Sequence, residues 1–437
     1  MEPDRTATSD AALRRRLSLG VCVFLLVVAV TVAVNHSVHA IHAWYDLPDS
    51  AAKRPNGDFS YYYVAGASWR AGLDPYLRLV SDHDDVSRLR GERFSYYVYP
   101  PTALPLFGGL SRLDYDDARW LWLVLGLTAF VALVTFAAES AGERGLEVVA
   151  VVALLVVSSN PLQYLIGRGQ ADLIVCSLAT MAFLFYRRWG SWPSAVLLAV
   201  AIVLKTAPLF VLAGLVLYHR DLRFLVRTAA CAAAVVALSL VTVAPHLYVE
   251  YVRDVLPSVS EGVATVGNQS ALRHLGNGPV PAVLGALGTL AFLALFYALG
   301  REPARSADRA GARPSWPDRS ELEVFLLMVT LMLLVSPVAW RSWFVWTIVP
   351  LAALLVAELH DGRLGAIVGL SLAGCLWSLR VYESMVYDLD LGAFTVYQFP
   401  ALTAPQLWGS VAALVTLATV IVGDRRRAAT GAAPSGP

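Results

Sequence analysis

Charged residues are scarce in this sequence. Of its 437 residues only 15% are Asp, Glu, Lys or Arg, whereas 57% are hydrophobic. Soluble globular domains carry about 25% charged residues, so this composition indicates a protein that crosses a membrane many times. The formal net charge is +1, and no basic cluster is interleaved with aromatic residues as a nucleic-acid groove requires. We therefore expect no nucleic-acid partner.

Cysteine is also scarce. Cys22, Cys176, Cys231 and Cys375 all lie in apolar runs, and none forms a C-x-x-C pair. Because thiols in such runs behave as small hydrophobic groups, we predict neither a disulfide nor a metal site. The sequence also lacks a Ser-His-Asp order, a His/Cys metal spacing and a phosphate-binding loop. We expect no metal and no cofactor.

Long apolar runs, in contrast, are abundant. The first covers 17–34, which exceeds the roughly 7 to 15 apolar residues of a signal peptide. We therefore predict a retained first helix behind a cytoplasmic tail, 1–16. Later runs cover 118–138, 146–157, 171–186, 192–218, 222–243, 281–299, 322–335, 344–358, 364–379 and 406–422. Together they predict an all-α, polytopic transmembrane bundle with about 11 to 12 membrane segments.

The arginines indicate the orientation of these segments, because positive charge accumulates on the cytoplasmic side. Clusters at 187–188, 220–227, 301–319 and 425–427 mark that side. We predict a membrane domain over 17–424, a first extracytoplasmic loop over 39–98 with short interfacial helices, and a disordered cytoplasmic tail over 425–437. The protein is expected in the plasma membrane.

Two segments do not fit a simple crossing. The proline-rich run 99–113 is short, and we expect it to be re-entrant. The run 192–218 is interrupted at Lys205-Thr206-Ala207-Pro208, and we expect its two halves to start and end on the cytoplasmic side. This assignment places 160–170 outside, together with Asp58.

Asp58 lies just outside the first span, beside the aromatic residues of the stretch Gly57-Asp58-Phe59-Ser60-Tyr61-Tyr62-Tyr63. Aromatic rings at a bilayer interface offer an amphipathic surface to a sugar or a lipid headgroup, and a carboxylate there can take a proton from a hydroxyl group. The alternative interpretation is a solvated loop acid beside an ordinary interfacial belt. Local composition does not separate the two.

Lys205 interrupts an otherwise apolar run. A lysine inside a membrane segment costs about 2.5 to 3.5 kcal/mol on insertion scales, so its ammonium should face protein, water or an anion. A lipid phosphate is the natural anion in a membrane. The alternative is a lysine whose ammonium reaches the headgroup region.

Three further polar motifs stand in predicted outer segments. Arg168-Gly169-Gln170 precedes a helix, where an arginine and backbone N–H groups can hold a phosphate; Arg168 can equally be a residue that only flanks a span. Gly267-Asn268-Gln269-Ser270 supplies amide groups that suit sugar hydroxyls. Trp340 and Arg341 lie at the outer end of a predicted helix, where an arginine beside indole rings can bind a phosphate.

These motifs, taken in order, resemble glycosyltransferase family 87. The resemblance covers most of the chain and rests on Asp58, Tyr63, Gly72-Leu73-Asp74-Pro75-Tyr76, Tyr99-Pro100-Pro101, Asn160-Pro161, Gly169-Gln170, Lys205-Thr206-Ala207-Pro208, Gly267-Asn268-Gln269-Ser270 and Ser336-Pro337-Val338-Ala339-Trp340. It implies a membrane enzyme of the GT-C fold that uses polyprenyl-phosphate sugars, chiefly for mannosyl transfer. The sequence departs from the family at Arg341-Ser342-Trp343, where we expect histidines.

The resemblance and the residues together predict an inverting transfer on the extracytoplasmic face to a glycolipid or polysaccharide acceptor. Asp58 would be the general base. The donor phosphate would bind Lys205, Arg168 and Arg341. The sugar or acceptor would contact Tyr62, Tyr63, Tyr99, Gln170, Asn268, Gln269 and Trp340.

Two alternatives stay open. Relatives of the family that transfer arabinofuranose imply the same machinery with a different donor. A transporter or flippase of lipid-linked sugars would also have broken helices and a charge within the membrane. A transporter of this kind is built from repeated halves, and we find no internal repeat in the sequence.

Overall fold

The computed structural model describes most of the chain, and that part is built from helices. It describes residues 25, 58–76, 97–188, 190–258, 270–272, 279–300, 319–336, 339, 341–379 and 405–430. Within these residues there is no β-strand, which confirms the all-α prediction. Nearly all of the predicted first span, both predicted tail ends at 1–16 and 431–437, and most of the loop at 39–98 lie outside the described residues.

The helices follow the apolar runs of the sequence. They are α2 (Asp58–Arg70), α4 (Leu104–Leu110), α5 (Tyr115–Ala141), α6 (Gly145–Ser158), α7 (Asn160–Arg168), α8 (Asp172–Arg188), α9 (Ser191–Leu204), α10 (Pro208–His219), α11 (Leu222–Ser239), α12 (Pro245–Glu250), α13 (Leu256–Ser258), α14 (Pro279–Leu299), α15 (Arg319–Val335), α16 (Ile348–His360), α17 (Leu364–Ser378) and α21 (Pro405–Thr430). Short segments of other helix types are η1 (Pro101–Ala103), η2 (Gly142–Arg144), η3 (Tyr251–Val255) and η7 (Arg341–Thr347).

Several of these helices have the length and composition of membrane spans. Within the described part of the chain, five stretches are long and apolar enough to cross a membrane: Tyr115–Ser158, Leu222–Ser239, Ala282–Leu299, Ser342–His360 and Pro405–Arg426. In α11 and α14 only 17% of the most apolar window is buried inside the protein. Exposed apolar faces of this size are rare on soluble proteins and fit contact with lipid. The chain is an integral membrane protein.

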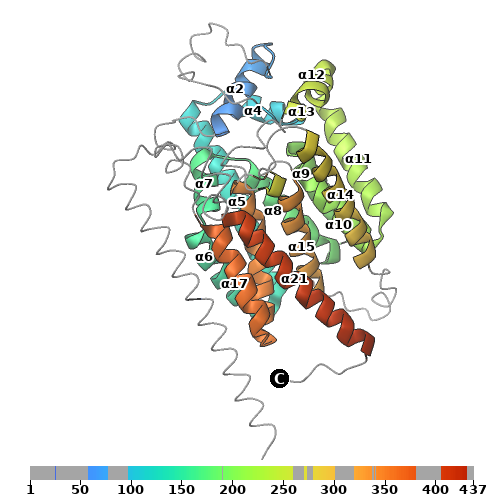
Figure 1. Ribbon diagram of the computed structural model, residues 1–437. Helices are drawn as coiled ribbons and strands as arrows, with labels where there is room; N and C mark the ends of the chain where they lie inside the picture. Colours follow the sequence, from blue (N-terminus) through green and yellow to red (C-terminus); the bar gives the residue numbers. More distant parts are fainter. Residues whose placement is uncertain are drawn as a thin grey trace, which may run out of the picture.

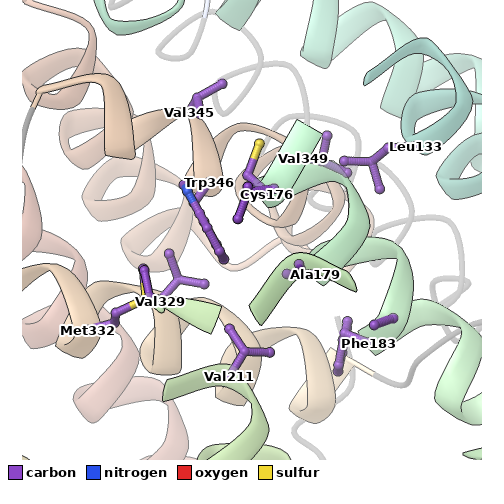
Figure 2. Packing of buried hydrophobic residues seen from close by; sticks show 14 of the residues in the cluster. Leu133, Cys176, Ala179, Phe183, Val211, Val329, Met332, Val345, Trp346 and Val349 are labelled. Carbon is purple, nitrogen blue, oxygen red and sulfur yellow. The ribbon is translucent and has the colours of Figure 1, made fainter. Parts of the chain in front are cut away.

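The core of the bundle lies where α8, α10, α15 and α16 meet. Figure 2 shows side chains of these elements gathered around Trp346, among them Cys176, Val211 and Met332, and each of these four is at most 1% exposed. Cys176 is a free thiol in this core, where it fills space as a small apolar group. The core fixes the relative positions of the helices whose ends carry the polar residues described below.

The interrupted run at Lys205 forms a helical hairpin. At the ends far from Lys205, Tyr186 of α8 donates a hydrogen bond to Asp221 just beyond α10 at 2.8 Å, and Arg227 of α11 donates one to Ser191 at the start of α9. At the other end Lys205 lies at the tip, between α9 and α10. The helices have 14 and 12 residues, which gives about 21 and 18 Å, less than the roughly 30 Å hydrocarbon core. The two halves therefore turn back within the bundle, and the side of the membrane on which they begin and end stays a prediction.

The segment after Tyr99 does not cross the bundle. It forms η1 and the seven-residue α4, which packs against α2. The two helices approach so closely that a β-carbon on Gly66 would lie 2.3 Å from the backbone carbon of Phe107. A glycine is required at this contact, and it keeps α2, with Asp58 at its first residue, fixed on the bundle. Figure 1 shows α2 and α4 together at one end of the molecule.

The opposite end of the bundle carries a cluster of ion pairs. Arg319, at the start of α15, contacts Glu358 at 2.6 Å, Glu323 at 2.9 Å and Asp361 at 3.0 Å. Arg363 contacts Asp424 of α21 at 3.0 Å. This end lies away from α2 (Figure 1). The helix α21 continues to Thr430, into the segment that the sequence predicts as a cytoplasmic tail.

Candidate functional site

Asp58 is held by two side chains from the turn after α7. Arg168 donates to Oδ1 of Asp58 from Nε at 2.9 Å and from Nη2 at 2.7 Å. Gln170 donates to Oδ2 from its amide nitrogen. The Asp58 side chain is 16% exposed, so it remains within reach of a ligand. The structure thus brings Asp58 together with Arg168 and Gln170 of the Arg168-Gly169-Gln170 motif.

The pair with Asp58 also determines the charge of Arg168. Burial disfavours the charged guanidinium, but the negative charge of Asp58 and then the nearby Tyr164 outweigh it, so the pKa of Arg168 is raised above its ordinary value. The guanidinium carbon lies 5.3 Å from the centre of the Tyr164 ring. Arg168 is therefore a permanent cation that is already paired.

The turn that carries these side chains depends on the end of α7. The sequence analysis placed 160–170 outside and predicted no helix there, whereas most of the segment is helical. Ser159 accepts a hydrogen bond from the Leu162 N–H at 3.2 Å and so caps the first turn of α7, as Ser does at many helix starts. Gly169 ends the helix with φ +65°, and a β-carbon there would lie 2.8 Å from that of Phe59. Glycine is the residue that fits both demands.

Tyr62 and Tyr99 lie beneath this turn and are buried or half-buried. Tyr62 is 0% exposed; its hydroxyl donates to that of Tyr99 at 2.6 Å and accepts from the Ala171 N–H at 3.3 Å. Burial, followed by the negative charge of Asp58, raises the pKa of Tyr62 well above its ordinary value, so this hydroxyl stays protonated. In this arrangement Tyr62 supports the turn and does not face a ligand.

Lys205 lies near Tyr99 and is paired with Asp172. Its ammonium contacts Oδ1 of Asp172 at 2.6 Å, and Ser342 donates to Oδ2 at 3.3 Å. The ammonium also lies 4.6 Å from the centre of the Trp343 ring and 5.7 Å from that of Tyr99. The Lys205 side chain is 13% exposed and that of Asp172 is 1% exposed.

The sequence analysis missed Asp172, although a signal was present. The residue begins an apolar helix two positions after Gln170, and a carboxylate at such a place needs a partner for the same reason that Lys205 does. The partner lies 33 residues away, in the next hairpin, and the sequence alone gives no pairing. Its presence changes the setting of Lys205 from an unpaired cation to one half of a buried ion pair.

The remaining predicted residues are only partly described. Tyr63 is half-buried, and its hydroxyl donates to the Leu113 carbonyl at 2.9 Å. Arg341 begins η7, but its side chain is not among those that the structure describes. Its neighbours Ser342 and Trp343 contact the Lys205 pair. Three predicted contacts lie outside the described residues: Asn268, Gln269 and Trp340.

The site therefore consists of two ion pairs on one turn. Arg168 and Gln170 hold Asp58, Ala171 holds Tyr62, and Asp172 holds Lys205. Asp58 offers a carboxylate to a hydroxyl group, and Lys205 offers a cation to an anion. Among the described residues no group of three or more His, Cys, Asp or Glu side chains could hold a metal ion.

The sequence is similar to those of known glycosyltransferases. The sequence model of glycosyltransferase family 87 matches residues 97–337, which is just over half of the 437 residues. Over 346 residues the chain is 28% identical to a Mycolicibacterium smegmatis protein described as a polyprenol-phosphate-mannose-dependent alpha-(1-2)-phosphatidylinositol mannoside mannosyltransferase, covering 74% of this chain and 75% of that protein. No solved structure matches the chain. The chain therefore belongs to glycosyltransferase family 87 and is a glycosyltransferase of the membrane.

Proposed function

We propose that this glycosyltransferase transfers mannose from a polyprenyl-phosphate donor to a glycolipid or polysaccharide acceptor on the extracytoplasmic face, with inversion at the anomeric carbon. The proposed donor is supported by the name of the Mycolicibacterium smegmatis relative, which specifies polyprenol-phosphate mannose. The observation that carries the mechanism is the half-buried Asp58 carboxylate, held in place by Arg168 and Gln170.

Asp58 acts as the general base. A carboxylate has about four lone-pair positions, and Arg168 and Gln170 occupy three of them. The remaining position on Oδ2 is free to accept the proton of an acceptor hydroxyl. Such a base contributes a factor of about 10² to 10⁴ in rate.

The reaction is a single displacement. The acceptor oxygen forms a bond to the anomeric carbon, the bond from that carbon to the donor phosphate oxygen breaks, and the electron pair leaves with polyprenyl phosphate. The acceptor proton passes to Asp58. A retaining double displacement needs a carboxylate nucleophile in addition to the base, and the other carboxylate of the described site, Asp172, is 1% exposed and paired with Lys205. This geometry favours inversion.

Lys205 is the cation that best suits the departing phosphate. Its ammonium is partly exposed and has three N–H donors, whereas Arg168 already directs two donors to Asp58. Positive charge aimed at a leaving phosphate lowers the barrier, because the phosphate gains negative charge in the transition state. We assign to Arg168 a weaker contact with the donor phosphate. Arg341, from the motif that resembles the family, is the third proposed contact.

The extracytoplasmic orientation is supported by the arginines at the other end of the bundle. Arg425 of α21 donates to the Leu299 carbonyl at 3.0 Å, and Arg319 and Arg363 bind acidic residues at the ends of α16 and α21. Arginine-rich ends lie on the cytoplasmic side. The site with Asp58 lies at the opposite end and thus faces outward.

The acceptor belongs to the lipid-linked glycosides, in keeping with the phosphatidylinositol mannoside in the name of the relative. We assign its sugar to the surface beside Asp58. Tyr63 is half-buried there, and Asn268, Gln269 and Trp340 stay predicted contacts. Tyr62 and Tyr99 contribute by supporting the turn.

Purified protein in nanodiscs tests this function directly. Transfer from polyprenyl-phosphate mannose to a membrane glycolipid extract should be detectable by mass spectrometry as a gain of one hexose. Polyprenyl-phosphate arabinose serves as the competing donor. Transfer of a pentose in place of a hexose would reassign the sugar, and movement of the donor across the bilayer without transfer would replace the enzyme assignment with a transporter.

A further inference from the structure

The most deeply buried carboxylate of the site has no part in the reaction described so far. Asp172 is 1% exposed, at the start of α8. Both of its oxygens are occupied, Oδ1 by Lys205 at 2.6 Å and Oδ2 by Ser342 at 3.3 Å. Burying a carboxylate costs several kcal/mol unless it is paired well, so a residue of this kind needs an explanation.

Asp172 determines where the ammonium of Lys205 lies. The lysine follows the last residue of α9, and its backbone is extended there, with φ −156° and ψ 138°. A long side chain at a helix end has many rotamers. Among the described residues Asp172 is the acceptor to which Lys205 donates, while the rings of Trp343 and Tyr99 lie against the ammonium. One N–H is thereby fixed, which leaves two others for an incoming anion.

The same pairing ties the cation to the base. Asp172 follows Gln170 by two residues, and Gln170 donates to Asp58. Gly169 fixes the conformation of the turn, and Ala171 anchors it to Tyr62. The separation between the carboxylate that takes the proton and the ammonium that meets the leaving group is therefore determined by one short segment of chain.

We propose that Asp172 is a positioning residue for sugar transfer, which holds the Lys205 ammonium against the phosphate of the departing polyprenyl carrier. The inference rests on the proposed function. In the transfer step the proton goes to Asp58 and the electron pair of the broken bond goes to the phosphate oxygen, where Lys205 compensates the added charge. Asp172 touches neither substrate and acts through the place it gives to Lys205.

This role differs from that of a counter-charge that only stabilises the fold. A counter-charge affects the stability of the protein and the amount of folded enzyme. A positioning residue affects the maximal rate of the folded enzyme. The apparent donor KM should change less than the rate, since loss of the carboxylate also leaves the site more positive and this attracts an anionic donor.

The test compares Asp172→Asn, Asp172→Glu and Ser342→Ala with Asp254→Asn, a control that removes an exposed carboxylate paired with Arg253. Transfer is measured from purified polyprenyl-phosphate mannose across a donor titration, normalised to folded protein. For Asp172→Asn we expect kcat to fall roughly 10- to 100-fold, the size linked to a hydrogen bond with a charged group. The donor KM should stay within about threefold, because binding and rate are affected separately.

The other variants test the positioning role from different sides. Ser342→Ala should lower kcat by roughly 2- to 10-fold, less than Asp172→Asn does, because the 3.3 Å hydrogen bond from Ser342 is long and Lys205 keeps its partner. This variant decides the matter if Asp172→Asn does not fold. Asp172→Glu keeps the charge and should retain more activity than Asp172→Asn. In a Lys205→Met background, Asp172→Asn should have little further effect on kcat, because coupled residues are not additive.

The outcomes separate this inference from the proposed function. If the parent protein transfers no mannose, the proposed function fails. If the parent is active and folded Asp172→Asn or Ser342→Ala matches it in kcat, the positioning role is overturned. An equal loss of kcat from Asp172→Asn with and without Lys205 would also overturn it, since Asp172 would then act independently of the lysine.

Discussion

The ion pair of Lys205 and Asp172 predicts an asymmetric response of stability to neutralisation. Lys205→Met leaves Asp172 charged and 1% exposed, and removing one partner of a buried ion pair costs about 3 to 5 kcal/mol. Asp172→Asn leaves Lys205 13% exposed, with the Trp343 ring 4.6 Å from its ammonium. Its partial exposure and this contact compensate part of the loss, and we expect a cost of about 1 to 3 kcal/mol.

The double variant Lys205→Met/Asp172→Asn should recover most of the lost stability. Neither charge is then buried alone, and buried ion pairs replaced on both sides are often close to neutral. The losses of stability in the two single variants, added together, should therefore exceed the loss in the double variant by at least about 2 kcal/mol. Lys205→Met should cost more stability than Asp172→Asn, because it leaves the more buried of the two groups, Asp172, without its partner.

The assay is equilibrium unfolding of purified protein, with SDS titrated into a mild detergent and the folded fraction followed by tryptophan fluorescence. Arg253→Met, Asp254→Asn and their double variant form the matched control. That pair is exposed, at 74% and 49% of its side chains, and exposed pairs contribute little, so these variants should show no measurable coupling. A Lys205→Met protein as stable as the parent would refute the reasoning.

Three further predictions concern the turn and the opposite end of the bundle. Gly169→Ala should lower the free energy of unfolding by about 1 to 2 kcal/mol, because Gly169 has a φ of +65° and Phe59 leaves no room for a β-carbon. Tyr62→Phe leaves the buried Ala171 N–H without its acceptor and should cost about 1 to 3 kcal/mol together with a fall in kcat. Arg319→Met removes the partner of the buried Glu358 and should lower the free energy of unfolding by about 3 to 5 kcal/mol. The kcat of the folded fraction should stay at the parental value.

The fold could be predicted from the sequence to a large extent, because apolar runs report burial in lipid. The run at 171–186 became α8, and the interruption at Lys205 became the tip of a hairpin. Residues 160–170 gave a weaker signal. That segment is too short and too mixed for an apolar run, and its helix depends on the Ser159 cap and on Gly169, which are local features that a search for membrane spans does not weigh.

The candidate site was predictable in its residue types and less so in its pairings. Asp58 and the Arg168-Gly169-Gln170 motif were both predicted from the sequence, and the structure joins them. The sequence shows that a charge at Lys205 needs a partner, but a partner 33 residues away leaves no local pattern. Tyr62 was predicted to touch the sugar. It is 0% exposed instead, since its hydroxyl serves the backbone of the turn.

The most direct measurement of the central claim is the turnover of Asp58→Asn. The amide keeps the size of the side chain and loses the base, so transfer from polyprenyl-phosphate mannose should fall by at least about 100-fold. Donor binding, followed as quenching of tryptophan fluorescence by polyprenyl phosphate in nanodiscs, should remain within a few-fold of the parent. Turnover of folded Asp58→Asn close to the parental rate would contradict the assignment of Asp58 as the general base.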